Sequence, residues 1–295
     1  MSEILEMLKF MAAPFAACLI LVSVHGYLGL HVLLRKVIFV DLALAQIAAL
    51  GSVIALILGH APGSPASFAW SLGSAVFGAF IFSFTRGSHG REAKVPQEAL
   101  IGITYVIASA TAILVADRAP EGAEHIKEAL AGTILWVTWP TVLKVLAIYA
   151  IILLYHYAFR KRFILISEDP ERAFRQGINI RLWDFLFYLS FGVVITLAVE
   201  IAGVLMVFSY LVAPAIIALG SSDRWGPRIA IAGGVGFLAS ALGLIASYKV
   251  DFPSGPAIVC SLGLVLLVFG AWRALFARKR APVPAGAGGD EVMAA

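Results

Sequence analysis

Long apolar runs, broken by short polar or charged loops, follow one another along almost the whole chain. A helix needs about 20 predominantly apolar residues to cross the hydrocarbon core of a bilayer. Nine runs approach that length: 10–33, 37–59, 67–85, 97–116, 140–159, 184–199, 203–219, 228–247 and 255–276. Helices are expected because each one satisfies its own backbone N–H and C=O groups inside the bilayer. The pattern predicts an all-α polytopic membrane protein, a bundle of about eight or nine transmembrane helices.

The stretch from 184 to 219 is ambiguous, since its 36 residues are few for two crossings and many for one. Loop charge separates the two alternatives. If the stretch is a hairpin, 17 of the 22 Lys and Arg residues fall on one side of the membrane, together with the C-terminus. Basic residues concentrate in cytoplasmic loops. The hairpin is therefore favoured, with the C-terminus in the cytoplasm.

Composition agrees with a membrane protein, because 61% of the 295 residues are hydrophobic and only 14% are charged, against about a quarter charged in soluble domains. We expect residues 1–280 to form a single transmembrane domain and the Pro/Gly/Ala-rich residues 281–295 to form a disordered cytoplasmic tail. The acidic N-terminus does not resemble a cleaved signal peptide. The +4 net charge reflects the loop asymmetry and gives no reason to expect a nucleic-acid partner. Cys18 and Cys260 lack the spacing of a disulfide or thiolate metal site.

A short helix is predicted inside the charged loop 160–183. Asp169 suits the N-cap and Pro170 the first helical position. Gly177 suits the position just after the last turn. The helix is expected over 170–176, with Ala173 and Gly177 four residues apart on one face that another surface can approach closely. Three arginines around it offer donors for carboxylates: Arg172, Arg175 and Arg181. The alternatives are a solvated loop and a docking element for a cytoplasmic partner.

The docking alternative gains weight from a resemblance. "DPERAFRQGI" (169–178) is similar to the coupling helix of permease subunits in zinc, manganese and iron importers of the ABC class, with Asp169, Pro170, Arg172, Ala173, Arg175 and Gly177 inside it. Four further segments resemble that family in the same order: "GYLGLHVLLRKVIFVDLALAQIAALG" (26–51), "EALIGITYVIASATAILV" (98–115), "EIAGVLMVFSYLVAPAIIALG" (200–220) and "DFPSGPAIV" (251–259).

The resemblance implies an assembly. Two permease copies in the cytoplasmic (inner) membrane of a bacterium or archaeon, surrounded by lipid, would work with two ATPase chains, and an extracytoplasmic binding protein would deliver the metal. The chain has no GxxxxGK[ST] phosphate loop, so ATP would bind to the partner subunit and this chain would not be an enzyme. It would bind no permanent cofactor, and a divalent metal ion would be its substrate.

Asp41 and Gln46 are the first candidates for the metal route, because charged side chains inside a membrane mark transport pathways. The family pattern is Gly-Asp followed by Ser-His-Ala, and its Asp and His are thought to line the route. This chain departs from the pattern: Val40 replaces the Gly, one extra residue separates Asp41 from Ala45, and Gln46 replaces the His. An amide is a harder, weaker ligand than imidazole. The alternative for Asp41 is a structural ion pair with Arg35 or Lys36.

Four other polar residues are candidates for the same route. His25 and His31 lie at the end of the preceding helix, but six residues apart they do not share a face, and packed helix-end histidines are the plainer interpretation. Glu200 is expected at the outer turn of the hairpin, where a carboxylate that reaches water needs no special role. Glu98 begins a span near the cytoplasm, where the helix dipole alone favours an acid.

An acidic stripe is expected outside, where a helix over 117–137 would align Glu121 with His125 and Glu124 with Glu128. The stripe could concentrate divalent cations at the entrance. It could equally be the wet face of an interfacial helix or a docking surface for the binding protein.

The leading hypothesis is thus the permease subunit of an ATP-driven importer for divalent metal ions, zinc first, with manganese or iron as alternatives. A permease for metal chelates such as cobalamin or haem is the nearest rival, because its path needs no metal ligands. An ion-coupled secondary transporter would show repeated halves with broken helices, which the sequence lacks. An intramembrane enzyme would need a nucleophile with its partner, and no such motif occurs.

Overall fold

The computed structural model describes residues 2–85, 95–118, 130, 132 and 134–277, and every regular element among them is helical. The side chains of residues 2–8 and 277 are outside this description. The elements are α1 (Ser2–Leu34), α2 (Val40–Ile57), α3 (Pro65–Thr85), α4 (Gln97–Ala116), η1 (Ile134–Trp136), α6 (Trp139–Ala158), α7 (Arg160–Glu168), α8 (Pro170–Arg175), α9 (Ile180–Ser221), α10 (Trp225–Val250) and α11 (Ser254–Ala277). The expected all-α fold is confirmed.

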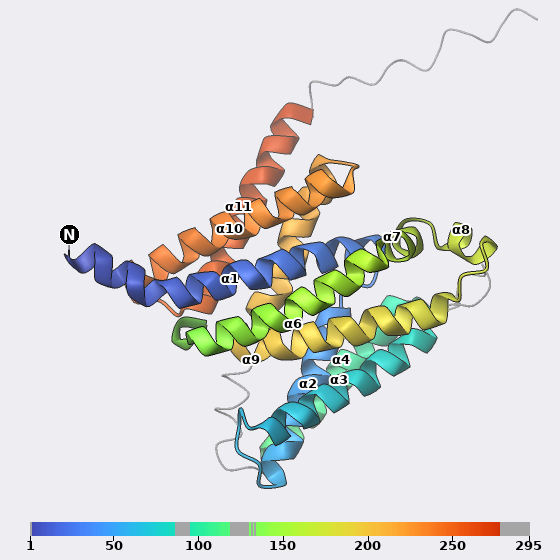
Figure 1. Cartoon of the computed structure of the whole chain (residues 1–295), viewed down its shortest axis with the longest axis horizontal. Coiled ribbons are helices and arrows are strands. Elements are labelled where there is room, and N and C mark those ends of the chain that lie inside the picture. Colours follow the sequence, from blue (N-terminus) through green and yellow to red (C-terminus); the bar gives the residue numbers. More distant parts are fainter. Residues whose placement is uncertain (1, 86–94, 119–129, 131, 133, 278–295) are drawn as a thin grey trace, which may run out of the picture.

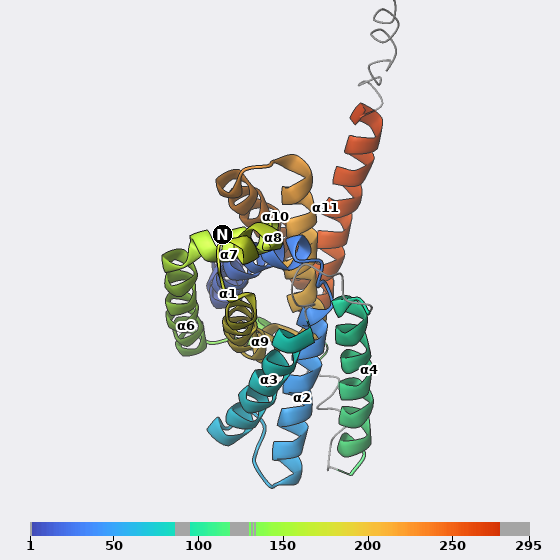
Figure 2. The ribbon, with the colours of Figure 1, turned by 90° about the vertical axis from the view of Figure 1, so that its right-hand side faces the viewer.

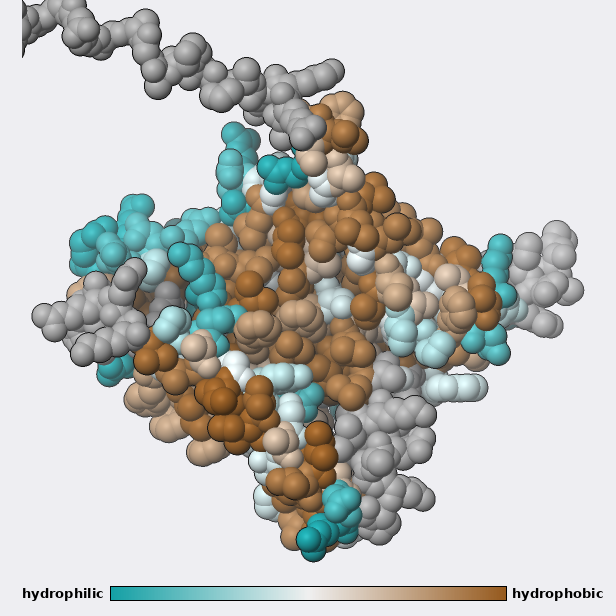
Figure 3. Space-filling view, turned by 180° about the vertical axis from the view of Figure 1, so that it is seen from behind, coloured by the Kyte–Doolittle hydropathy of each residue, from teal (hydrophilic) through white to brown (hydrophobic). Residues whose placement is uncertain are grey.

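Eight of these helices are long and apolar enough to cross a membrane, and α9 contains two of the predicted runs. Helix α9 is the most buried of the eight: 78% of its most apolar 18-residue segment is buried, compared with 11% for α11. Helices α1, α2, α3, α10 and α11 pack around α9. Figure 3 shows a broad apolar surface between hydrophilic patches at its two edges, the distribution expected of a bundle that faces lipid.

Helix α9 doubles back instead of crossing once. Gly203, with φ 74° and ψ 159°, interrupts it, and in Figures 1 and 2 the parts before and after the kink run in different directions. Glu168 precedes α9 in sequence, yet its carboxylate accepts a 2.8 Å hydrogen bond from Trp225 Nε1 at the start of α10. Both ends of α9 therefore lie at the same end of the molecule, beside α7 and α8 (Figure 1). The predicted hairpin is confirmed.

The short helix predicted in the charged loop is present. Asp169 Oδ1 accepts a 2.9 Å hydrogen bond from the backbone N–H of Arg172, Pro170 is the first helical residue, and Gly177 has the positive φ of 73° that a residue just after a helix often adopts. The helix ends at Arg175, one residue before the expected end. The preceding helix α7 was not predicted from the sequence.

The expected small-residue face on α8 is wrong. Ala173 is completely buried against the rest of the chain, whereas Gly177 is exposed and a Cβ there would meet nothing within 4 Å. The two residues therefore do not form one outward surface. The exposed side of α8 consists of Glu171, Arg172, Phe174 and Arg175.

Candidate functional site

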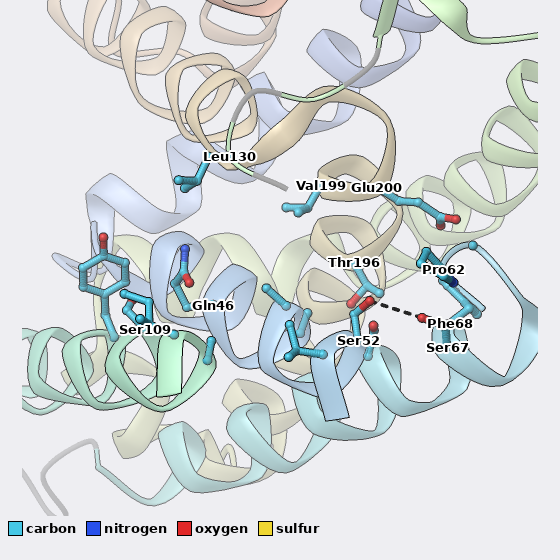
Figure 4. Close-up of a pocket in the computed structure, with 18 residues that line it drawn as sticks. Gln46, Ser52, Pro62, Ser67, Phe68, Ser109, Leu130, Thr196, Val199 and Glu200 are labelled. Carbon is cyan, nitrogen blue, oxygen red and sulfur yellow. Dashed lines mark hydrogen bonds between the residues drawn. The ribbon is translucent and has the colours of Figure 1, made fainter. Parts of the chain in front are cut away.

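A pocket of about 430 Å³ lies between α2, α3, α4 and α9 (Figure 4). Six hydroxyl-bearing side chains line it: Ser52, Ser67, Ser71, Tyr105, Ser109 and Thr196. One amide, Gln46, and one carboxylate, Glu200, complete its polar lining. The pocket thus offers oxygen atoms from four helices, together with the amide nitrogen of Gln46, and no imidazole or thiolate among the described residues that line it.

Small residues allow these helices to approach closely and leave the hydroxyls at the contacts. Gly51 faces the backbone of α3, where an added Cβ would lie 2.5 Å from the Trp70 carbonyl oxygen. One residue further along α2, the hydroxyls of Ser52 and Ser67 lie 3.2 Å apart, the hydrogen bond drawn in Figure 4. Ser109 Oγ is buried without a hydrogen-bond partner. A buried hydroxyl without a hydrogen-bond partner is energetically unfavourable, so Ser109 Oγ is available to bind a ligand that enters the pocket.

Glu200 and Gln46 lie toward opposite ends of the lining (Figure 4). Glu200 is exposed and lies near the turn that follows α2, because a Cβ on Gly63 would be 3.9 Å from Glu200 Oε1. Arg35, five residues before α2, donates to Ser167 of α7, so α2 begins at the α7 end of the molecule and the turn after α2 lies at the end opposite α8 (Figure 1). The pocket extends from that end to Gln46 in the middle of α2.

Asp41 lies outside the pocket, nearer the α8 end. It is buried, and its Oδ1 has no hydrogen-bond partner. Gln46 is five positions further along the chain, so the two side chains project about 140° apart around α2. Ala45, buried and apolar, follows Asp41 by one turn on nearly the same face. The extra residue between Asp41 and Ala45, relative to the family pattern, therefore places Asp41 and Gln46 on different faces of α2. Their role in a metal route stays a prediction.

The proposed pairing of Asp41 with Arg35 is wrong. Arg35 Nη1 instead donates a 2.6 Å hydrogen bond to Asp184 Oδ1 at the start of α9, and its guanidinium carbon lies 4.0 Å from the centre of the Phe187 ring. Both charged side chains are almost completely buried.

His25 and His31 are buried and do not line the pocket. His25 Nδ1 donates to the Leu21 carbonyl oxygen at 2.7 Å, and its Nε2 is buried without a partner. Because Ser167 gives its only proton to the Phe163 carbonyl oxygen, His31 Nδ1 must donate to Ser167 Oγ, at 2.8 Å. These contacts fit packed histidines at the helix end, and their placement on a metal route stays a prediction.

Glu98 connects two helices. Its Oε1 accepts a 2.9 Å hydrogen bond from the backbone N–H of Phe39, just before α2, so it holds the start of α4 against the start of α2. The external candidates lie outside the described residues: Glu121, Glu124, His125 and Glu128. Among the residues that the structure does describe, no three His, Cys, Asp or Glu side chains gather as metal ligands.

Comparison with known proteins decides the family. The model of the ABC 3 transport family matches residues 7–273. The chain belongs to the ABC 3 transport family.

Relatives of this ABC 3 family member include the manganese transport system membrane protein MntC of Listeria monocytogenes, 23% identical over 83% of this chain and 84% of the relative. The chelated iron transport system membrane protein YfeD of Yersinia pestis is 25% identical over 70% of this chain and 72% of the relative. Among solved structures, a chain of PsaBC from Streptococcus pneumoniae in complex with Fab superimposes with a TM-score of 0.75 at 21% identity, covering 91% of this chain and 94% of that chain.

Sequence reasoning missed two features of this ABC 3 chain. The pocket hydroxyls did not stand out, because hydroxyl-bearing residues are common in membrane helices. Ser67 and Ser71, four residues apart, do indicate a polar stripe on one face of α3. Asp184 lies near the start of an apolar run, and a carboxylate inside a membrane segment is a candidate functional residue, so the sequence did contain a signal for it. Its partner Arg35 is 149 positions away, and no sequence pattern connects them.

Proposed function

We propose that this chain is the membrane-spanning permease subunit of an ATP-driven importer for divalent metal ions. The pocket carries the proposal: its lining includes six hydroxyls, an amide and, at its outer end, an exposed carboxylate, and it lies in a chain of the ABC 3 transport family. The names of the manganese and chelated-iron relatives support a metal substrate. An ATPase, an external binding protein and a second permease copy complete the transporter in the cytoplasmic membrane.

The donor set favours manganese over zinc. Carboxylate and other oxygen ligands suit Mn²⁺, whereas imidazole and thiolate suit Zn²⁺. The lining supplies hydroxyls, an amide and Glu200. The volume of about 430 Å³ is many times what one water molecule needs, so the pocket admits an ion that keeps part of its hydration shell.

The route we propose runs inward along α2. Glu200 attracts the cation at the outer end, and the hydroxyls and Gln46 replace some of its water. Asp41 lies about 7.5 Å further along the helix, buried and with a free carboxylate oxygen. The ion reaches Asp41 only when the helices around α2 move, so the carboxylate serves as the inner acceptor of an alternating-access cycle.

The exposed face of α8 is the proposed contact with the ATPase. Arg172 and Arg175 offer charged donors and Phe174 an apolar ring that is 48% exposed. The loop charges support a cytoplasmic position for α8 and the C-terminus, with the pocket on the opposite, external side.

Reconstitution tests the proposal. Proteoliposomes that hold the chain and its ATPase should take up radioactive Mn²⁺ only with ATP, and Asp41→Ala should lower uptake by about 10- to 100-fold. Ser23→Ala, an exposed hydroxyl bonded only within α1, is the matched control and should leave uptake unchanged. Full-rate uptake by the chain alone would contradict the proposal.

The size of the pocket supports a second candidate, a permease for small metal chelates, since 430 Å³ falls within the range of ligand pockets. A chelate carries its own ligands, so this candidate expects Asp41→Ala to be tolerated. It expects Ser109→Trp, which fills the pocket, to block uptake of the chelate.

A further inference from the structure

The last two residues of α7, directly before α8, contact two different parts of the bundle. Ser167 contacts His31 of α1, and Glu168 contacts Trp225 of α10. These two residues join the N-terminal side of α8 to the membrane-spanning helices, whereas its C-terminal side continues through residues 176–179 into α9.

The Ser167 hydroxyl uses its full hydrogen-bonding capacity. Its Oγ accepts hydrogen bonds from Arg35 Nε at 2.9 Å and His31 Nδ1 at 2.8 Å, and donates to the Phe163 carbonyl oxygen at 2.9 Å. A hydroxyl has one proton and two lone pairs, so all three positions are used. Arg35 continues the connection to Asp184 of α9 at 2.6 Å.

The Arg35–Asp184 pair that continues this connection is shielded from water. The side chains of Arg35 and Asp184 are 1% and 0% exposed. Separating a buried ion pair leaves a charge without compensation in a low-dielectric interior, which is strongly unfavourable. The connection from α7 through Ser167 and Arg35 to α1 and α9 therefore stays intact as the helices move.

Glu168 makes a different kind of contact. Its Oε1 accepts from Trp225 Nε1 at 2.8 Å and lies 3.7 Å from Arg228 Nη1. The Glu168 side chain is 43% exposed, so water can replace its partners. Arg228 has two other partners when Glu168 leaves: its Nε donates to the Ser222 carbonyl oxygen at 2.7 Å, and its Nη2 lies 3.6 Å from Asp223.

We propose that Glu168 is a releasable positioning residue that transmits movement of α8 to α10, while Ser167 and Arg35 keep α7 attached to α1 and α9. The inference rests on the proposed function, since it assumes that α8 contacts an ATPase. When Glu168 engages Trp225 and Arg228, α10 follows α8; when Glu168 is released, α10 no longer follows α8.

The test measures Mn²⁺ transported per ATP hydrolysed by the complete transporter in proteoliposomes. Glu168→Ala should lower this ratio at least about fivefold, the lower range of measured couplings between sites, with ATP hydrolysis retained. Asp117→Ala is the matched control, because this exposed carboxylate at the C-terminal end of α4 lies outside α7, α8 and α10. It should leave the ratio unchanged. An unchanged ratio in Glu168→Ala overturns the inference.

A second measurement covers the case in which Glu168→Ala fails to assemble. In a Cys260→Ser background, Glu168→Cys and Arg228→Cys are joined by a short reducible cross-linker. The cross-linked transporter should lose uptake and regain it on reduction, whereas full uptake while cross-linked overturns the inference. Absence of ATP-dependent Mn²⁺ uptake in the unmodified transporter would instead refute the proposed function.

Discussion

Asp41 and Asp184 show how two buried carboxylates of one bundle take different roles. Asp184 has Arg35 at 2.6 Å, so its charge is compensated within the chain. Asp41 has an oxygen without any hydrogen-bond partner. A buried carboxylate with a spare oxygen is the one that a passing cation can use, and this contrast supports a structural role for Asp184 and the place of Asp41 on the proposed route.

Asp184→Asn should destabilise the protein without touching the pocket. It removes the charge that compensates Arg35, and breaking a buried pair costs about 3 to 5 kcal/mol. The Tm in detergent, followed by intrinsic tryptophan fluorescence, should fall by several degrees. Glu171→Gln is the control, since its pair with Arg175 is largely exposed and such pairs contribute little. Equal Tm values for the two variants would contradict the assignment.

Gln46→His should change the metal preference of the pocket. An imidazole there adds a nitrogen ligand, and nitrogen ligands favour Zn²⁺. We expect Zn²⁺ to inhibit Mn²⁺ uptake at an about tenfold lower concentration, equivalent to about 1.4 kcal/mol of binding. Ala49→His places the same group elsewhere in the lining and separates a specific position from a general gain in affinity. No change in zinc inhibition by Gln46→His would argue against an ion that passes Gln46.

At the scale of helices, Gly203 gives α9 its shape. Its φ of 74° and ψ of 159° fall in a region that only glycine enters without strain. The reversal at Gly203 returns the chain to the α8 end, and the turn of helix that ends at Glu200 forms one wall of the pocket.

Gly203→Ala should therefore cost about 1 to 3 kcal/mol and reduce uptake by distorting that wall. Gly263→Ala is the matched control, because Gly263 lies within α11 and a Cβ there meets nothing within 4 Å. Thermal stability and Mn²⁺ uptake of both variants should be compared at equal amounts of protein. If Gly203→Ala matched the control in both measurements, the strain argument would fail.

Most of the helices could be predicted from the sequence because each crossing depends on local hydropathy. The hairpin at 184–219 followed from loop charge, a property of the sequence alone. The orientation of Ala173 could not be predicted, because α8 is too short to fix its own buried face and takes it from the rest of the fold. The partner of Arg35 was also missed, because Asp184 is 149 positions away along the chain and the nearby Asp41 offered the same charge.

At the scale of the whole molecule, the pocket and α8 lie at opposite ends, so the proposed import has a direction built into the bundle. In a Cys260→Ser background, Glu200→Cys should react with a membrane-impermeant maleimide added outside intact cells. Arg175→Cys should react only after the membrane is opened, because α8 is proposed to be cytoplasmic. Labelling of both from the same side would contradict the topology.

The five-residue spacing between Asp41 and Gln46 has a consequence for how such a permease can change its substrate. No point substitution at Gln46 brings its side chain onto the face of Asp41. Removing one residue would align them, but it would turn the remainder of α2 by about 100° and drive Gly51 away from its contact with α3. The close packing of that helix therefore opposes the one-residue deletion that would create a paired-ligand site.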